Sequence, residues 1–77
     1  MPILKRFGNC SIKVYADDHH PPHFHVTGPD FQIIVRIFDG KVIAGQASRT
    51  QIAEAMAWAK ANKDTLMLKW RELNERN

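Results

Sequence analysis

The pattern of hydrophobic and polar residues changes once along the chain, near Ser48. Before this point, short runs of β-branched and aromatic residues alternate with turn-forming residues. After it, the chain is rich in Ala, Leu, Met, Lys and Glu and contains neither Gly nor Pro. Strands followed by helices are typical of an α+β fold. We therefore expect a single domain over residues 1–77, with an antiparallel sheet of four to five strands in about residues 1–47 and two C-terminal helices in about residues 48–77.

Turn-forming residues divide the first part into extended segments. Asp39-Gly40 is the clearest signal, because both positions of a two-residue hairpin turn favour a positive φ. The register that follows pairs Ile37 with Val42, Arg36 with Ile43 and Val35 with Ala44. Gly8-Asn9 and Gly28-Pro29-Asp30 predict two further turns. The predicted strands are Ile3–Phe7, Ser11–Tyr15, His23–Thr27, Phe31–Phe38 and Lys41–Gln46.

Helical periodicity begins after Ser48, which forms a capping box with Gln51 three residues later. The segment Asn62-Lys63-Asp64 interrupts the pattern, with Asn62 as a left-handed C-cap and Asp64 as the N-cap of a second helix. Apolar residues recur at helical spacing on both sides of this break. They are Ile52, Ala55, Met56 and Ala59 in the first helix and Leu66, Met67, Trp70 and Leu73 in the second. We expect the two tryptophans, Trp58 and Trp70, to be core or interface residues.

All four histidines of the chain fall between His19 and His25. They belong to the stretch Asp17-Asp18-His19-His20-Pro21-Pro22-His23-Phe24-His25-Val26. In an extended strand, His23 and His25 point to one face of the sheet. Phe24 and Val26 then point to the other face, and we expect both to join the core.

The neighbouring strand and the preceding loop bring further polar groups to the histidine face. A loop of even length around Pro29 places His23 beside Arg36, on the same face of the sheet. Pro21-Pro22 restricts the backbone and predicts a stiff, polyproline-like spacer before an edge strand. This spacer would position polar side chains for a site, or it would simply protect the edge of the sheet. The candidate site residues are Asp18, His19, His23, His25 and Arg36.

Three interpretations of this cluster remain open. Its donor types suit zinc or another divalent metal ion, with Asp18, His19, His23 and His25 as candidate ligands. Alternatively, the cluster cleaves RNA without a metal: His23 and His25 exchange protons near neutral pH. Arg36 would then bind phosphate and Asp18 would orient His19. In the third interpretation the histidines are structural, and they bond to the backbone and pack on aromatic neighbours.

Charge and composition narrow the partners and the compartment. The net charge of +3 and the pI of about 9.4 permit a nucleic-acid partner, although the basic residues are dispersed along the chain. The single cysteine, Cys10, suits a reducing compartment. We see neither a signal peptide nor an apolar run near the roughly 20 residues of a membrane span. We therefore expect a cytoplasmic protein without a membrane partner, and its small core favours a homodimer or a bound protein.

The histidine stretch also carries a family resemblance. The run Asp18-His19-His20-Pro21-Pro22-His23-Phe24-His25-Val26 resembles the D-H-x-P-P-H-F-H-V signature of a family of small bacterial proteins, domain of unknown function 4160. His20 occupies the variable position of this signature. The likeness extends to Met1-Pro2, Phe7-Gly8, Gly45, Trp58, Leu66 and Trp70.

This resemblance implies a partner protein and a function. Members of the family are often encoded beside a second small protein, and some are described as toxins of type II toxin–antitoxin pairs. The expected function is that of a toxin that acts on RNA or translation and is bound by a small cognate antitoxin-like protein. The alternative is a non-enzymatic module that binds a metal ion or a partner. An apolar second sheet face with Ile34, Phe38 and Ile43 would suit a partner, unless the helices of the protein cover that face.

Overall fold

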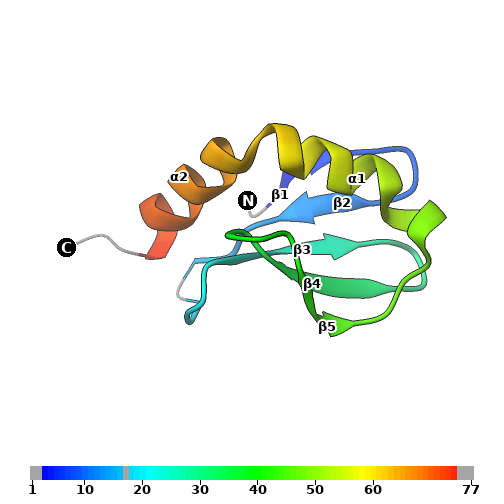
Figure 1. Ribbon diagram of the computed structural model, residues 1–77, viewed down its shortest axis with the longest axis horizontal. Coiled ribbons are helices and arrows are strands. Elements are labelled where there is room, and N and C mark those ends of the chain that lie inside the picture. The colour runs from blue at the N-terminus through cyan, green and yellow to red at the C-terminus, as the bar shows by residue number, and fades with distance from the viewer. Residues whose placement is uncertain (1–2, 17, 75–77) are drawn as a thin grey trace.

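The computed structural model describes residues 3–16 and 18–74, which form five strands followed by two helices (Figure 1). The strands are β1 (Ile3–Arg6), β2 (Ser11–Lys13), β3 (His23–Thr27), β4 (Gln32–Arg36) and β5 (Val42–Gly45). The helices are α1 (Arg49–Ala61) and α2 (Lys63–Asn74). The predicted α+β class, an antiparallel sheet followed by two C-terminal helices, is confirmed.

The sheet is a meander in which each strand pairs antiparallel with its sequence neighbours, in the order β1-β2-β3-β4-β5. The turns near Gly8-Asn9 and Gly28-Pro29-Asp30 lie where they were predicted. The N–H groups of Phe7 and Gly28 close them by donating to the carbonyls of Cys10 and Phe31. β3 is the central strand, so the prediction of an edge strand is wrong. The reason is that β2 and β4 both form hydrogen-bonded ladders with it.

The connection between β4 and β5 is longer than the predicted two-residue turn. The N–H of Arg36 donates to the carbonyl of Lys41 at 2.9 Å, so residues 37–40 form the loop. The observed pairs are Val35–Val42, Ile34–Ala44 and Ile33–Gly45, in place of the predicted Ile37–Val42, Arg36–Ile43 and Val35–Ala44. The cause is Ile37, which leaves the strand to join the core and is only 3% exposed. Gly40 does take the expected positive φ, +71°.

The helices begin and end close to their predicted limits. Ser48 and Gln51 form the predicted capping box at the start of α1. Asn62 separates the helices, but its φ of −122° is not left-handed, because its side chain instead donates to the carbonyl of Trp58 at 2.8 Å. α2 already begins at Lys63, so Asp64 lies in its first turn and not at its N-cap. Within the described residues, no helix is long and apolar enough to cross a membrane.

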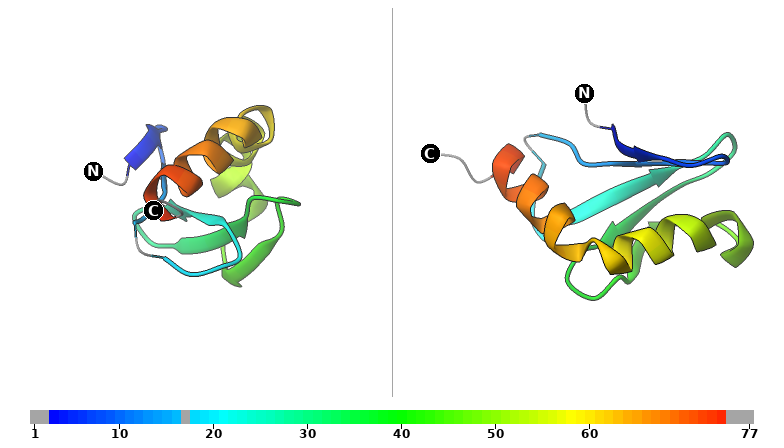
Figure 2. Two further views of the ribbon diagram at one scale, coloured as in Figure 1. Left: turned by 90° about the vertical axis from the view of Figure 1, so that its left-hand side faces the viewer. Right: turned by 90° about the horizontal axis from the view of Figure 1, so that it is seen from above.

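The two helices follow one another along one face of the sheet, with a bend between them (Figure 2). This covered face forms the core, to which Phe24 and Val26 contribute as predicted, together with Trp70 of α2. Trp58 is half-buried and packs edge-on against Phe7, with ring centroids 6.4 Å apart. The remaining members of the buried core are Cys10, Ile12, Val14, Ile33, Val35, Ile37, Ala55, Ala59 and Leu66.

The second sheet face only partly matches the expected apolar surface. Ile34 is half-buried on this face and Ile43 is 40% exposed, and the helices lie on the opposite side. Phe38 does not belong to this face, because it lies in the β4–β5 loop. Phe38 is 70% exposed, and the centroid of its ring lies 5.5 Å from Nζ of Lys63 in α2.

Candidate functional site

β3 places two of the histidines close together. His23 lies opposite Arg36 and Thr27 lies opposite Gln32 in the β3–β4 ladder, as the even loop length predicts. The ring centroids of His23 and His25 are 5.3 Å apart. The side chain of His23 is only 5% exposed and that of His25 only 12% exposed. The two rings therefore form one buried pair and not two separate surface residues.

The loop before β3 brings Asp18 to this pair. The backbone bends at His20 and Pro21, which differs from the predicted polyproline-like spacer, and the peptide bond between these residues is cis. The end of α2 holds the loop, because the N–H of Asp18 donates to Oδ1 of Asn74 at 2.6 Å. Nδ2 of Asn74 also donates to the carbonyl of Tyr15 at 3.0 Å. One side chain from the C-terminal helix thus anchors both ends of the segment that carries Asp18.

His23 is held from both sides. Its Nδ1 lies 2.7 Å from the carbonyl oxygen of Pro21, and its Nε2 lies 2.8 Å from Oδ2 of Asp18. Because a carbonyl oxygen can only accept, Nδ1 carries a hydrogen. The other ring nitrogen, Nε2, points at the Asp18 carboxylate, and a proton between Nε2 and Oδ2 of Asp18 completes a hydrogen bond between them. The ring of Trp70 packs against His23 with a centroid distance of 5.0 Å and fixes its orientation.

His25 completes the cluster. Its Nε2 lies 3.6 Å from Oδ2 of Asp18, the same oxygen that contacts His23. Its Nδ1 lies 3.2 Å from the amide nitrogen Nε2 of Gln32, and its ring packs edge-on against Tyr15 with ring centroids 4.6 Å apart. Nε2 of His25 is buried and has no hydrogen-bond partner within residues 3–16 and 18–74. Such an orphaned polar atom is uncommon in a folded protein and calls for a physical explanation.

The electrostatics of the cluster follow from its burial and charges. Burial raises the pKa of the Asp18 carboxyl, but the charge of His23 and the hydrogen bonds of the site outweigh it, so the net pKa lies below its ordinary value. For His25, burial lowers the imidazole pKa, and the nearby Asp18 carboxylate opposes this only in part. The site therefore holds an ionised carboxylate beside a His25 ring that is neutral at neutral pH.

The other two candidate residues lie outside this cluster. The side chain of His19 is 92% exposed, and its Nδ1 lies 3.6 Å from Oδ1 of Asp18. Arg36 shares the sheet face of His23, but its guanidinium binds Asp39 through two bonds of 2.9 and 2.5 Å. Of the five predicted site residues, the structure thus gathers Asp18, His23 and His25.

Four residues that support the site were not predicted as site residues. They are Tyr15, which follows the end of β2, Gln32 of β4, and Trp70 and Asn74 of α2, and each contacts a residue of the cluster. Only Gln32 was recoverable, because the predicted register of β3 and β4 places it diagonally from His25. The Asp18–Asn74 contact spans 56 residues and has no signature in local sequence patterns.

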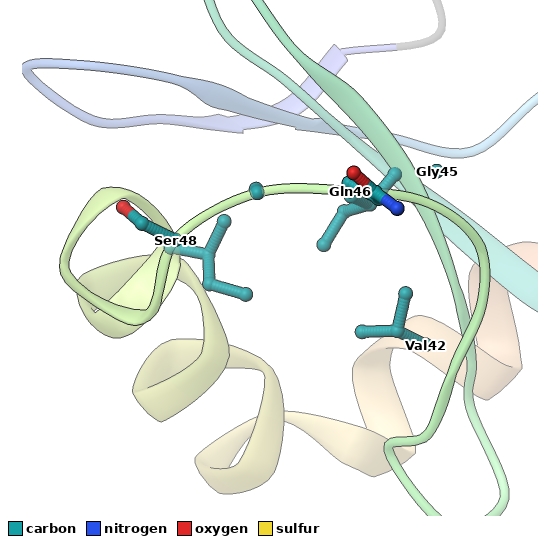
Figure 3. Close-up of a pocket in the computed structure, with 7 residues that line it drawn as sticks. Val42, Gly45, Gln46 and Ser48 are labelled. Carbon is teal, nitrogen blue, oxygen red and sulfur yellow. The ribbon is translucent and has the colours of Figure 1, made fainter.

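A separate open pocket lies between the end of β5 and the start of α1 (Figure 3). Its lining residues are Ile33, Val42, Gly45, Gln46, Ala47, Ser48 and Ile52. Gly45 has a φ of +83°, and a Cβ here would lie 2.2 Å from the carbonyl oxygen of Gln32. This close approach of two backbones requires glycine. None of the histidines lines this pocket, so it is distinct from the cluster.

These observations define a small α+β domain with a buried carboxylate–imidazole cluster at one end of its sheet. A family model described as domain of unknown function (DUF4160) matches residues 10–71, and the chain belongs to this family. Met1 and Pro2, which contribute to the sequence resemblance, lie outside the described residues. No curated protein and no solved structure matches the chain.

Proposed function

We propose that this protein is the toxin of a type II toxin–antitoxin pair, and that it acts on RNA or translation through Asp18, His23 and His25. The observation that carries the proposal is the convergence of two imidazoles on one carboxylate in a small, basic domain. Grouped imidazole and carboxylate side chains are suited to proton transfer on a substrate such as a phosphodiester. The toxin assignment also draws on the family resemblance, in which some members are described as toxins.

The cluster supports different roles for its two histidines. His25 has a lowered pKa, and its Nε2 has no hydrogen-bond partner among the residues that the structure describes, so its neutral ring can accept a proton from a substrate hydroxyl. His23 is hydrogen-bonded on both nitrogens and is oriented by Asp18, which suits a proton donor. Arg36 has no role in this scheme because it is paired with Asp39.

A non-enzymatic module that binds a partner is the second candidate. The observation that favours it is the exposure of large apolar side chains, with Phe38 at 70% and Leu68 at 66%. A small cognate antitoxin-like protein or a second copy of the chain would be the occupant of such a surface. In this case the expressed protein is harmless alone, and the histidines contribute to folding and not to toxicity.

Induced expression in a bacterial host separates the two candidates. The wild-type chain and the Asp39→Asn variant, which alters a carboxylate outside the cluster, should both stop growth and lower incorporation of labelled uridine or amino acids. His23→Ala and His25→Ala should restore growth, and co-expression of the neighbouring small protein should do the same for the wild type. The proposal fails at its site if these histidine variants, expressed alone, are as harmful as the parent. A harmless wild-type chain supports the binding module.

A further inference from the structure

The histidine cluster has the geometry of a metal site. One ligand atom from each of Asp18, His23 and His25 lies within 4.8 Å of the other two. The separations from Oδ2 of Asp18 are 2.8 Å to His23 and 3.6 Å to His25. Ligand atoms that bind one Zn²⁺ at its usual bond lengths lie about 3.3 Å from one another. The two carboxylate–imidazole separations therefore differ from this coordinating distance by only about 0.5 Å or less.

The hydrogen bonds on the outer side of His23 also match a metal ligand. A metal-bound histidine generally donates its second ring N–H to a carbonyl or carboxylate, which fixes the ring and leaves the other nitrogen free to coordinate. Nδ1 of His23 makes this bond to the carbonyl of Pro21 at 2.7 Å. Nε2 is thereby directed at Asp18 and at the centre of the cluster.

The buried ring nitrogen Nε2 of His25 gives the strongest support for a metal ion at this site. This nitrogen faces the carboxylate of Asp18 at 3.6 Å and has no hydrogen-bond partner among the described residues. A cation between the three side chains would satisfy this nitrogen. In the structure, the amide nitrogen Nε2 of the exposed Gln32 lies 3.2 Å from Nδ1 of His25. When Nε2 of His25 binds a metal, Nδ1 carries the proton, and a half-turn of the Gln32 amide then presents the oxygen that accepts it.

We propose that Asp18, His23 and His25 bind one Zn²⁺ ion through Oδ2, Nε2 and Nε2, respectively. Imidazole donors favour zinc over magnesium or calcium, which prefer shells of oxygen ligands. Three protein ligands leave a fourth position for water or a substrate oxygen, as in catalytic zinc sites. The ion would bring two positive charges to a site that otherwise presents a carboxylate, and this suits a phosphate group. Zinc binding does not depend on the proposed function; only the action of the bound ion on RNA rests on it. With Zn²⁺ bound, Nε2 of His23 and Nε2 of His25 are ligands and do not exchange protons, so the ion and the group in its fourth position would replace the proton-transfer roles of the two rings.

Calorimetric titration of the full chain with ZnCl₂ tests the site. The protein is purified without a histidine tag, treated with a chelator and dialysed. We expect one ion per wild-type chain, and Asp18→Asn and His25→Ala should weaken binding by at least about 100-fold. Gln32→Leu, which removes only the outer partner of His25, should weaken it by about 10-fold. His19→Ala and Asp39→Asn are the matched controls and should bind as the wild type does.

Fluorescence gives a second measurement that does not depend on the stability of a histidine-to-alanine variant. Trp70 lies 5.0 Å from His23, so Co²⁺ bound in the cluster should quench its emission. The Trp58→Phe background makes Trp70 the only tryptophan, and quenching should saturate at one Co²⁺ per chain and be reversed by Zn²⁺. Failure of wild-type protein to bind Zn²⁺, equal binding by His25→Ala, or loss of binding in His19→Ala overturns the site. Zinc binding by a chain that is harmless in cells overturns the toxin proposal alone, whereas toxicity without zinc binding overturns the metal site alone.

Discussion

Two aspartates in loops at the same end of the sheet show how differently a carboxylate can be used. Asp39 accepts two bonds from Arg36 and one from the backbone N–H of Lys41, and its side chain is 35% exposed. Asp18 is less exposed, at 20%, and its Oδ2 is approached by both His23 and His25. Both carboxyls have lowered pKa values, but only the second lies among groups that can bind or transfer an ion.

The difference lies in what each arrangement leaves unsatisfied. Around Asp39, donors and acceptors match one another, and the pair simply closes the β4–β5 loop. Around Asp18, the buried Nε2 of His25 has no hydrogen-bond partner in the described part of the chain. A lowered pKa alone therefore does not distinguish the two aspartates, whereas the buried nitrogen without a hydrogen-bond partner beside Asp18 does.

His23→Ala should have the largest effect on stability. The ring is buried against Trp70, and its loss also deprives Asp18 and the carbonyl of Pro21 of their hydrogen-bond partner. We expect the free energy of unfolding to fall by roughly 2–4 kcal/mol. Urea denaturation at neutral pH, followed by circular dichroism, measures this. If the unfolding free energies of His23→Ala and wild type agree within experimental error, the Asp18 cluster contributes no more to folding than the Asp39 pair.

The positions of His23 and His25 on β3 were predictable from the sequence because they depend on local geometry. The alternation of side chains along a strand places Phe24 and Val26 in the core and turns His23 and His25 the other way. The even loop around Pro29 then fixes the β3–β4 register. The alternation of side chains along β3 and the length of one loop were therefore sufficient to place both histidines.

The anchoring of the Asp18 loop and the pairing of β4 with β5 were not predictable. They depend on contacts between residues far apart in the sequence and on which side chains enter the core. Nothing local to Asp18 indicates that Asn74, 56 residues away, will hold its loop. The β4–β5 register was predicted from Asp39-Gly40 alone, whereas burial of Ile37 extends the loop and shifts the pairs. Arg36 was likewise assigned to the histidines from its face of the sheet, although Asp39 is its near neighbour in the loop.

Asn74→Ala should have an intermediate effect and tests how the Asp18 cluster is positioned. The change removes the bonds to the Asp18 N–H and to the carbonyl of Tyr15 without altering any proposed metal ligand. We expect a loss of about 1–2 kcal/mol in unfolding free energy and about 10-fold weaker zinc binding.

The matched control for this variant is Glu72→Gln, which removes an exposed ion pair with Lys69 on the same helix. The control should match wild type in both calorimetric titration and denaturation. Equal zinc affinity in Asn74→Ala and wild type would show that the Asp18 loop needs no anchor from α2.

Asp39→Asn should have the smallest effect on stability, and it tests whether the Arg36–Asp39 pair has only a structural role. In the folded protein the hydrogen bonds from Arg36 lower the pKa of Asp39 from 3.8 to about 2. A lowered pKa means that the ion pair stabilises the fold above about pH 4 and that this contribution is lost as the pH falls toward 2. Because the pair is exposed, the difference in denaturation midpoint between wild type and Asp39→Asn should be small at neutral pH, decrease with added salt and vanish below about pH 2. A difference larger than that of Asn74→Ala, or one that survives both high salt and low pH, would show that Asp39 does more than close its loop and would return Arg36 to the candidate site.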